Sequence, residues 1–225
     1  MTENEIRNAI VAACRQMNVL GINQGTSGNI SVRLGEAMLI SPYAVPYETM
    51  RAEDIAVMPI KASSGEGDYG AWSGPLPPSS EWRFHLDILR ARPGLAAVVH
   101  SHPTYCTTLA ITRREIPACH YMIAAFGGTN VRCAPYATYG TKALSEHALA
   151  ALADRFACLL ANHGMIALGE TLAQAMWRAV ELETLARHYY HSLVIGGPVL
   201  LSDAEIAETA AKFETYGLRA EIPAP

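Results

Sequence analysis

Short apolar runs typical of buried strands alternate with amphipathic helical patterns along the whole 225-residue chain. Helical spacing covers 4–20, 79–94, 141–155, 171–197 and 202–217, and strand-like runs cover 28–34, 37–42, 55–60, 96–102 and 157–169. Nothing between these segments resembles a linker strong enough to divide the chain. The pattern therefore predicts a single α/β domain over residues 1–225.

Composition excludes several classes of protein. The net charge is −4 and no long run of like charges occurs, which argues against a nucleic-acid surface. No apolar window approaches the roughly 18 residues of a membrane span, and the polar N-terminus is unlike a secretory signal. The five cysteines lack CxxC spacing and indicate reduced thiols. We expect a cytoplasmic protein that binds neither nucleic acid nor membrane.

The apolar run 96–99 ends in His100 and His102. Successive side chains of a strand point to opposite faces, so these two imidazoles share a face and can serve one cation. Zinc would need a third protein ligand and, for catalysis, an open position. The HxH motif is short, and a buried structural role for both histidines remains an alternative.

His163 is the best-placed third ligand, because it follows a strand and precedes Gly164, where the backbone can turn tightly. His120, beside Tyr121, is a weaker candidate. The remaining histidines of the long helical patterns are typical of packed or solvated side chains: His85, His147, His188 and His191.

Glu81 falls in the first turn of a helical pattern, behind Ser79 and Ser80. A surface acid favoured by the helix dipole, with a serine as N-cap, explains these residues without any ligand. Two hydroxyls at a helix N-terminus also suit an anion. The segment NQGTSGN at 23–29 is a second small polar cluster with the same two interpretations.

Seven motifs occur together in one order: LGINQGTSGNISVR, LPPSSEWRFH, AVVHSHP, IPACHYMIAAFGG, CAPYATYGT, LLANHGMIA and KFETYGLR. In this order and spacing the chain resembles the class II aldolase/adducin family, and within it the aldolases of L-fuculose 1-phosphate. The resemblance extends from the first helix to Arg219. It implies a three-layer α/β/α fold around a mostly antiparallel sheet, and a homotetramer with active sites at subunit interfaces.

The resemblance also implies a zinc ion, with Mn²⁺ or Co²⁺ as alternatives, held by His100, His102, His163 and Glu81. The implied reaction is reversible cleavage of a ketose 1-phosphate to dihydroxyacetone phosphate and an aldehyde such as lactaldehyde. Glu81 is the implied acid/base, and Tyr121 of a neighbouring subunit handles the proton at the aldehyde end. The chain's three lysines lie in a polar loop or helical patterns, which favours a metal over a Schiff base.

The substrate residues that the resemblance implies lie in four segments. Phosphate and substrate contacts are expected from Thr26, Gly28, Asn29, Tyr43, Ala44, Ser79 and Ser80, and substrate cover from Tyr139 and Tyr216. Two positions depart from the family pattern, because Tyr43 and Ala44 stand where the fuculose-phosphate enzymes carry Thr and Gly. Ala takes a positive φ less readily than Gly, so an altered phosphate site is expected.

Other functions occur on the same scaffold. A pentulose-phosphate 4-epimerase is the nearest rival, although those enzymes typically carry Asp where this chain has Glu81. A metal-dependent decarboxylase or dehydratase of a sugar-acid derivative is a second alternative. A non-catalytic adducin-like interaction module is a remote one, because such chains lose the metal ligands that this chain keeps.

Overall fold

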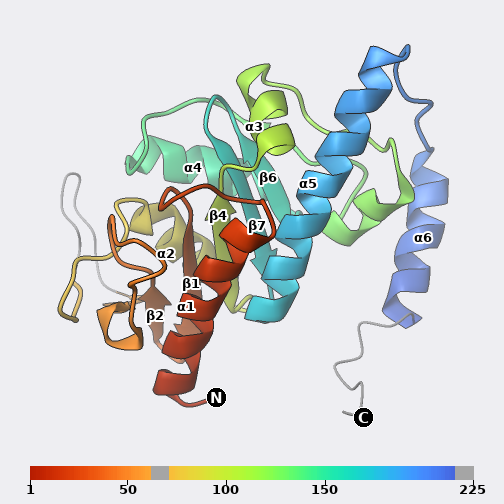
Figure 1. The fold of residues 1–225 in the computed structure, drawn as a ribbon. Coiled ribbons are helices and arrows are strands. Elements are labelled where there is room, and N and C mark those ends of the chain that lie inside the picture. Colours follow the sequence, from red (N-terminus) through yellow and green to blue (C-terminus); the bar gives the residue numbers. More distant parts are fainter. Residues whose placement is uncertain (62–70, 216–225) are drawn as a thin grey trace, which may run out of the picture.

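A computed structural model describes residues 1–61 and 71–215. In this part of the chain seven strands form one sheet in the order β3-β2-β1-β4-β7-β6-β5 (Figure 1). Only β5 and β6 run parallel, so the expectation of a mostly antiparallel sheet is confirmed. The strands are β1 (Asn29–Leu34), β2 (Ala37–Ile40), β3 (Ala56–Pro59), β4 (Ala97–Ser101), β5 (Cys133–Ala134), β6 (Ala157–Leu160) and β7 (Gly164–Gly169).

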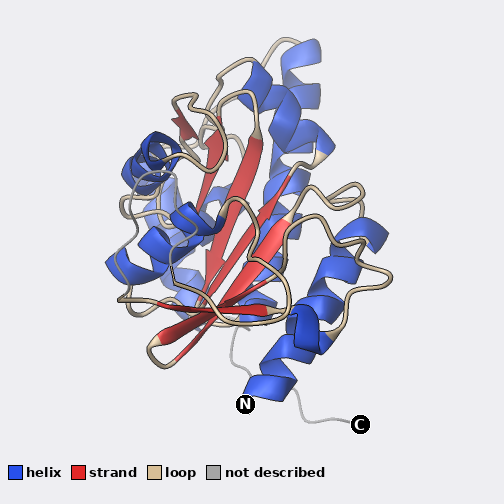
Figure 2. Cartoon of the chain, turned by 90° about the vertical axis from the view of Figure 1, so that its left-hand side faces the viewer, coloured by secondary structure: helices blue, strands red, loops and turns tan. Residues whose placement is uncertain are grey.

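Helices cover both faces of the sheet (Figure 2). One face carries α1 (Glu3–Val19), α3 (Thr104–Ile111) and α5 (Leu172–Val194), and the other carries α2 (Trp82–Ala91) and α4 (Lys142–Ala151). The last helix, α6 (Asp203–Thr215), packs on the 3₁₀ helix η2 (Tyr121–Phe126), and η1 (Ala52–Asp54) lies beside α1. This arrangement is the expected three-layer α/β/α fold.

The two central strands are buried on both faces. Along β4, Ala97 and Val99 pack into the core under α1 and α5, whereas Val98 packs into the core under α2 and α4. This double burial explains why β4 reads as a continuous apolar run. Strand alternation then places His100 on the same face as Val98, where it meets the ring of Phe84 on α2.

The start of α2 differs from the sequence expectation. The helix begins at Trp82, and the N-cap residue is Glu81 rather than Ser79 or Ser80. The Glu81 side chain makes no capping hydrogen bond. The hydroxyl of Ser79 instead accepts a hydrogen bond from the backbone N–H of Glu81, at 3.3 Å. The carboxylate is therefore free to point away from the helix.

Burial protects several of the thiols. All five cysteines are free, as expected, and Cys14, Cys106 and Cys158 are buried. Burial raises the pKa of the Cys14 thiol to about 12, so it stays protonated and unreactive. Within residues 1–61 and 71–215, none of the helices combines the length and apolar character needed to cross a membrane.

A carboxylate from α5 caps the N-terminus of α3. Pro103 occupies the N-cap position of α3 and offers no side-chain acceptor. Glu183 replaces it: its two carboxylate oxygens accept hydrogen bonds from the backbone N–H groups of Tyr105 and Cys106, at 2.8 and 2.9 Å. These donors would otherwise have no partner within the helix. Because α3 begins two residues after His102, this cap also fixes where His102 leaves the sheet.

We expect Glu183→Ala to destabilise the fold by about 1–2 kcal/mol, the usual cost of a lost N-cap, which lowers Tm by about 2–8 °C in a chain of this size. Thermal unfolding followed by circular dichroism measures the change. The control is Glu146→Gln on α4, where the carboxylate is exposed and pairs only with Lys142. Equal Tm values for the Glu183 variant and the wild type would contradict the capping role.

Candidate metal centre

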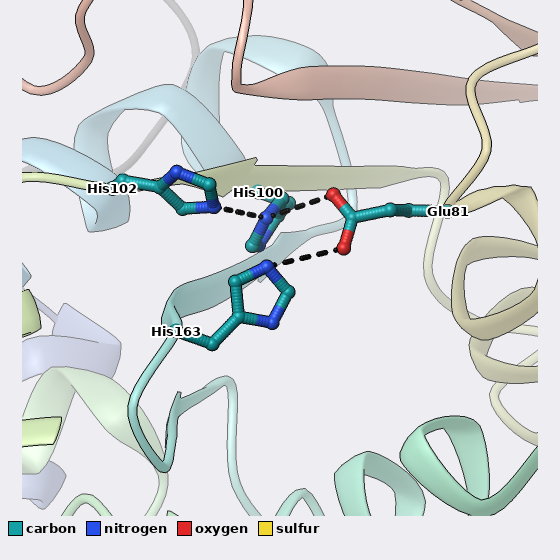
Figure 3. A group of neighbouring side chains, drawn as sticks. All are labelled: Glu81, His100, His102 and His163. Atoms are coloured by element: carbon teal, nitrogen blue, oxygen red, sulfur yellow. Dashed lines mark hydrogen bonds and ion pairs between the residues drawn. The ribbon is translucent and has the colours of Figure 1, made fainter. Parts of the chain in front are cut away.

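Four side chains from three separate segments meet at one end of the sheet (Figure 3). Glu81 comes from the start of α2, His100 and His102 from the end of β4, and His163 from the turn between β6 and β7. Each contributes one donor atom, and these atoms all lie within 4.8 Å of one another. The Nε2 atoms of His100 and His102 are 3.0 Å apart.

The orientation of His100 is fixed from behind. Its Nδ1 lies 2.9 Å from the carbonyl oxygen of Met165 on β7, a bond that requires a proton on Nδ1. In the neutral ring Nε2, which faces the cluster, is then the nitrogen that carries the free lone pair. This is the usual way in which a protein orients a metal-binding histidine.

The turn that carries His163 depends on its two neighbours. The left-handed residue of the turn is Asn162, with φ of 56°, and Gly164 is not among the residues with positive φ. The expectation that Gly164 serves the tight turn is therefore wrong. Gly164 is needed for space, because a Cβ atom there would lie 2.5 Å from Cδ2 of His102 and 2.5 Å from the carbonyl oxygen of Ser101.

Glu81 is a buried acid, with only 5% of its surface exposed, so the interpretation as a surface carboxylate is wrong. Its Oε2 accepts a hydrogen bond from Nδ2 of Asn29 at 2.9 Å and lies 3.0 Å from Nε2 of His100. Its Oε1 lies 3.2 Å from Nε2 of His163 and has no hydrogen-bond donor in proper geometry. Burial alone would raise the pKa of Glu81, but His100 and His163 lower it well below 4.5.

The donor set fits a divalent cation. Burial, with the neighbouring His100 and His163, lowers the pKa of His102 to about 3, so this ring is neutral and available as a ligand. Two ring nitrogens face each other at hydrogen-bond distance, and one buried carboxylate oxygen faces the cluster without a donor. Three imidazoles with one carboxylate are a donor set that zinc accepts.

The cluster forms the floor of a cleft of about 470 Å³. All of the residues predicted to contact substrate or phosphate line this cleft, as does Tyr139, which was predicted to cover it. None of the cleft-lining residues, which all belong to the described part of the chain, is a lysine or an arginine. They are Thr26, Ser27, Gly28, Asn29, Pro42, Tyr43, Ala44, Ser79, Ser80, Glu81, His102, Tyr136, Ala137, Tyr139, Asn162 and His163.

Ala44 adopts the backbone conformation that glycine favours, with φ of 54°. Left-handed backbone is disfavoured for a residue with a Cβ atom, so the chain maintains this shape at a steric cost. The exposed ring of Tyr43 lies beside Ala44 at this wall of the cleft.

One predicted catalytic residue lies outside the lining of the cleft. Tyr121, on η2, is half exposed and is absent from the lining of the cleft; its ring lies against His120 and Phe213. Tyr216 lies outside the described residues. His120, the weaker metal candidate, accepts a hydrogen bond from the backbone of Met122 and is not part of the cluster.

Several residues of the site were not singled out from the sequence. Ser27, Tyr136 and Asn162 line the cleft, and the buried His85 contacts Asn29 behind Glu81. The place of Ser27 and Tyr136 within or beside the family motifs could have identified them from the sequence. Nothing in the sequence indicated the role of His85, because its partners come from β1.

Residues 8–190 match the family described as Class II Aldolase and Adducin N-terminal domain. The chain belongs to this family. The resemblance inferred from the motifs is thereby confirmed, and the chain is a class II aldolase, a metal-dependent lyase.

Similar proteins cover nearly the whole aldolase. It is 48% identical over 220 residues to 5-methylthioribulose-1-phosphate/5-deoxyribulose-1-phosphate aldolase of Rhodospirillum rubrum, with 98% of this chain and 96% of the relative covered. It is 47% identical over 222 residues to L-fuculose phosphate aldolase of Escherichia coli K12, with 98% and 100% covered. The solved structure of an L-fuculose 1-phosphate aldolase matches with a TM-score of 0.87 at 37% identity, over 93% of this chain and 96% of that one.

We expect Gly164→Ala to weaken the affinity of the aldolase for a divalent metal by about 10–100-fold, as loss of a ligand-orienting contact does, because the added methyl group displaces His102. Competition of the metal-free protein with a chromogenic chelator for Zn²⁺ measures this affinity. Gly94→Ala is the matched control, since nothing lies within 4 Å of a Cβ atom there. Unchanged affinity in the Gly164 variant would mean that the His102 ring is not constrained by this contact.

Proposed function

We propose that this chain is a zinc-dependent aldolase that cleaves a ketose 1-phosphate reversibly to dihydroxyacetone phosphate and a short aldehyde. The observation that carries the proposal is the cluster of three imidazoles and one carboxylate on the floor of an open cleft whose lining contains no lysine or arginine. The names of the relatives support it, because the relatives from R. rubrum and E. coli are both aldolases of phosphorylated ketoses.

The proposed zinc ligands are His100, His102 and His163, with Glu81 beside them. A bound zinc ion supplies a Lewis acid for the negative charge that develops when the carbon–carbon bond breaks. The neutral rings leave the charge of the cation undiminished. The tautomer of His100, fixed by Met165, keeps its lone pair directed at the site.

Glu81 is the proposed acid/base. Its Oε2 is held by Asn29, whereas its Oε1 has no hydrogen-bond donor and is therefore the oxygen that can exchange a proton. In the cleavage direction Glu81 delivers a proton to the carbon that is released from the broken bond. In the synthesis direction it removes that proton from dihydroxyacetone phosphate.

The phosphate is proposed to bind at the cleft wall made by segments 26–29, 42–44 and 79–80. With no cationic side chain in this wall, recognition rests on the hydroxyls of Thr26, Ser79 and Ser80, on backbone N–H groups and on the start of α2. The left-handed backbone at Ala44 helps to expose such groups.

The other half of the substrate is proposed to carry an apolar terminal carbon. L-fuculose 1-phosphate, 5-deoxyribulose 1-phosphate and 5-methylthioribulose 1-phosphate, which the relatives' names specify, share the dihydroxyacetone phosphate half and end in a methyl or methylthio group. Three exposed or half-exposed phenol rings line the cleft and suit such a group: Tyr43, Tyr136 and Tyr139.

Tyr121 is proposed to act in a neighbouring subunit of a homotetramer, where it would handle the proton at the aldehyde oxygen. Its place on η2, away from the lining of its own cleft, and its half-exposed ring agree with a role on a neighbour rather than in its own subunit. Light scattering of the purified protein measures the assembly.

We expect the zinc-loaded protein to release dihydroxyacetone phosphate from L-fuculose 1-phosphate. We also expect it to cleave 5-deoxyribulose 1-phosphate with a kcat/KM about 10-fold above that for ribulose 1-phosphate, because the added hydroxyl of ribulose 1-phosphate loses its hydrogen bonds against an apolar wall. Coupling the product to a reductase gives the rates. Chelation abolishes the activity and added Zn²⁺ restores it. Epimerisation of L-ribulose 5-phosphate without any cleavage would overturn the proposal.

We expect Glu81→Gln to slow tritium exchange between water and dihydroxyacetone phosphate by at least about 100-fold, because the amide cannot accept the carbon-bound proton. Glu146→Gln, an exposed and distant change of the same kind, serves as the control. The oligomeric state of both variants stays that of the wild type. Exchange at the wild-type rate would exclude Glu81 as the base.

A further inference from the structure

We infer that His85 is a positioning residue that fixes the side-chain amide of Asn29, and through it the carboxylate of Glu81. The inference rests on the proposed role of Glu81 as the acid/base. It extends the site to a buried chain of hydrogen bonds that runs from Ser31 through His85 and Asn29 to Glu81.

The contacts in this chain are short and almost fully shielded from solvent. Nε2 of His85 lies 2.5 Å from Oδ1 of Asn29, and Nδ1 lies 2.7 Å from Oγ of Ser31. His85 and Ser31 have no exposed surface, and Asn29 is 4% exposed. The His85 ring also stacks on Phe84, with ring centroids 4.7 Å apart, so it has little freedom to rotate.

Each hydrogen bond in the chain has only one workable direction. The NH₂ group of Asn29 donates a hydrogen bond to Oε2 of Glu81, which sets the direction of the Asn29 amide. The amide oxygen of Asn29 then faces His85 and accepts a hydrogen bond from Nε2–H. Nδ1 of His85 is left as an acceptor and takes the hydroxyl proton of Ser31.

Without a donor at the His85 position, the buried amide oxygen of Asn29 loses its partner, and the contact with Glu81 is left to orient the amide. A flipped amide places Oδ1 against Oε2 of Glu81, two acceptors 2.9 Å apart, which repel each other. Burial first, and the neighbouring His100 second, lower the pKa of His85 to about 3, so the ring stays neutral, and the contact with Oδ1 of Asn29 places its proton on Nε2. The ring thus provides one donor in one fixed direction.

The contact between His85 and Asn29 does more than satisfy the buried nitrogens of the His85 ring. A buried histidine in an apolar core needs a partner for each nitrogen, and two solvent-free partners would satisfy it anywhere. Here one partner is the residue that holds Oε2 of Glu81, and the other carboxylate oxygen, Oε1, lies 3.2 Å from Nε2 of His163. We therefore expect His85 to affect the proton-transfer step rather than substrate binding.

Two substitutions at His85 separate positioning from packing. His85→Phe keeps a ring of similar shape and removes the donor, whereas His85→Gln places an amide N–H near the position of Nε2. We expect His85→Phe to lower kcat and the rate of tritium exchange by about 10–100-fold, while KM and the Zn²⁺ affinity stay within about threefold of the wild-type values. We expect His85→Gln to recover most of the lost kcat and exchange rate. His147→Phe on α4 is the matched control and keeps wild-type kinetics.

A readout independent of the reaction is the side-chain amide of Asn29, observed by NMR and assigned with Asn29→Asp. Its two protons are expected to be protected from solvent exchange in the wild type and in His85→Gln, and unprotected in His85→Phe. If His85→Phe does not fold, Ser31→Ala tests the same chain, with a smaller loss of kcat and of protection.

Equal kcat and equal Asn29 protection in His85→Phe and the wild type would overturn the inference. So would a failure of His85→Gln to recover any activity or protection. A wild-type protein that cleaves no ketose phosphate sinks the proposed function instead, and in that case the NMR comparison alone decides the role of His85.

Discussion

The antiparallel pairing of β4 with β7 is the constraint on which the metal centre depends. It sets His100 opposite Ile166 and brings Nδ1 of His100 to the carbonyl oxygen of Met165, which orients the ring. The turn that leads into β7 carries His163, and Gly164 at its end lets the His102 ring lie against the strand. The same ladder buries the central strands on both faces, so the energy that holds the core together also holds the ligands in place.

The proposed fourth ligand, Glu81, comes from the start of a helix in an unusual way. An N-cap side chain normally satisfies its own helix, but Glu81 occupies that position and turns its carboxylate toward the imidazoles. Ser79 supplies the local hydrogen bond, and Asn29, from β1, anchors the carboxylate from another direction. A buried carboxylate is unfavourable without such partners. Its presence here, with one oxygen lacking a donor, indicates a group kept for chemistry rather than for stability.

The sequence predicted those features that depend on neighbours along the chain. Periodicity located most helices and strands, and alternation along β4 placed His100 and His102 together, as the structure confirms. Among the elements it missed are η1, η2 and the two-residue strand β5, which are too short to produce a period. The local pattern also predicted Glu81 to be a surface acid, and only the family motifs indicated otherwise, because the burial of Glu81 depends on β1 and β4. The partnerships of Glu183 with α3 and of His85 with Asn29 join segments 77 and 56 residues apart, and no local pattern encodes them.

In this aldolase the proposed metal ligands come from strand ends and a short turn, whereas much of the cleft wall comes from loops. This difference helps to explain why similar aldolases are named for different substrates. The imidazoles project from the ends of strands or from a three-residue turn, whereas much of the cleft wall comes from the longer loops at 20–28, 41–51 and 135–141. Side chains on such loops can change without moving the metal ligands. Ala44, in one of these loops, adopts a left-handed backbone at a steric cost. Tyr43 beside it presents an exposed ring at the cleft, so the side chains of this wall are where we expect a difference in substrate to originate.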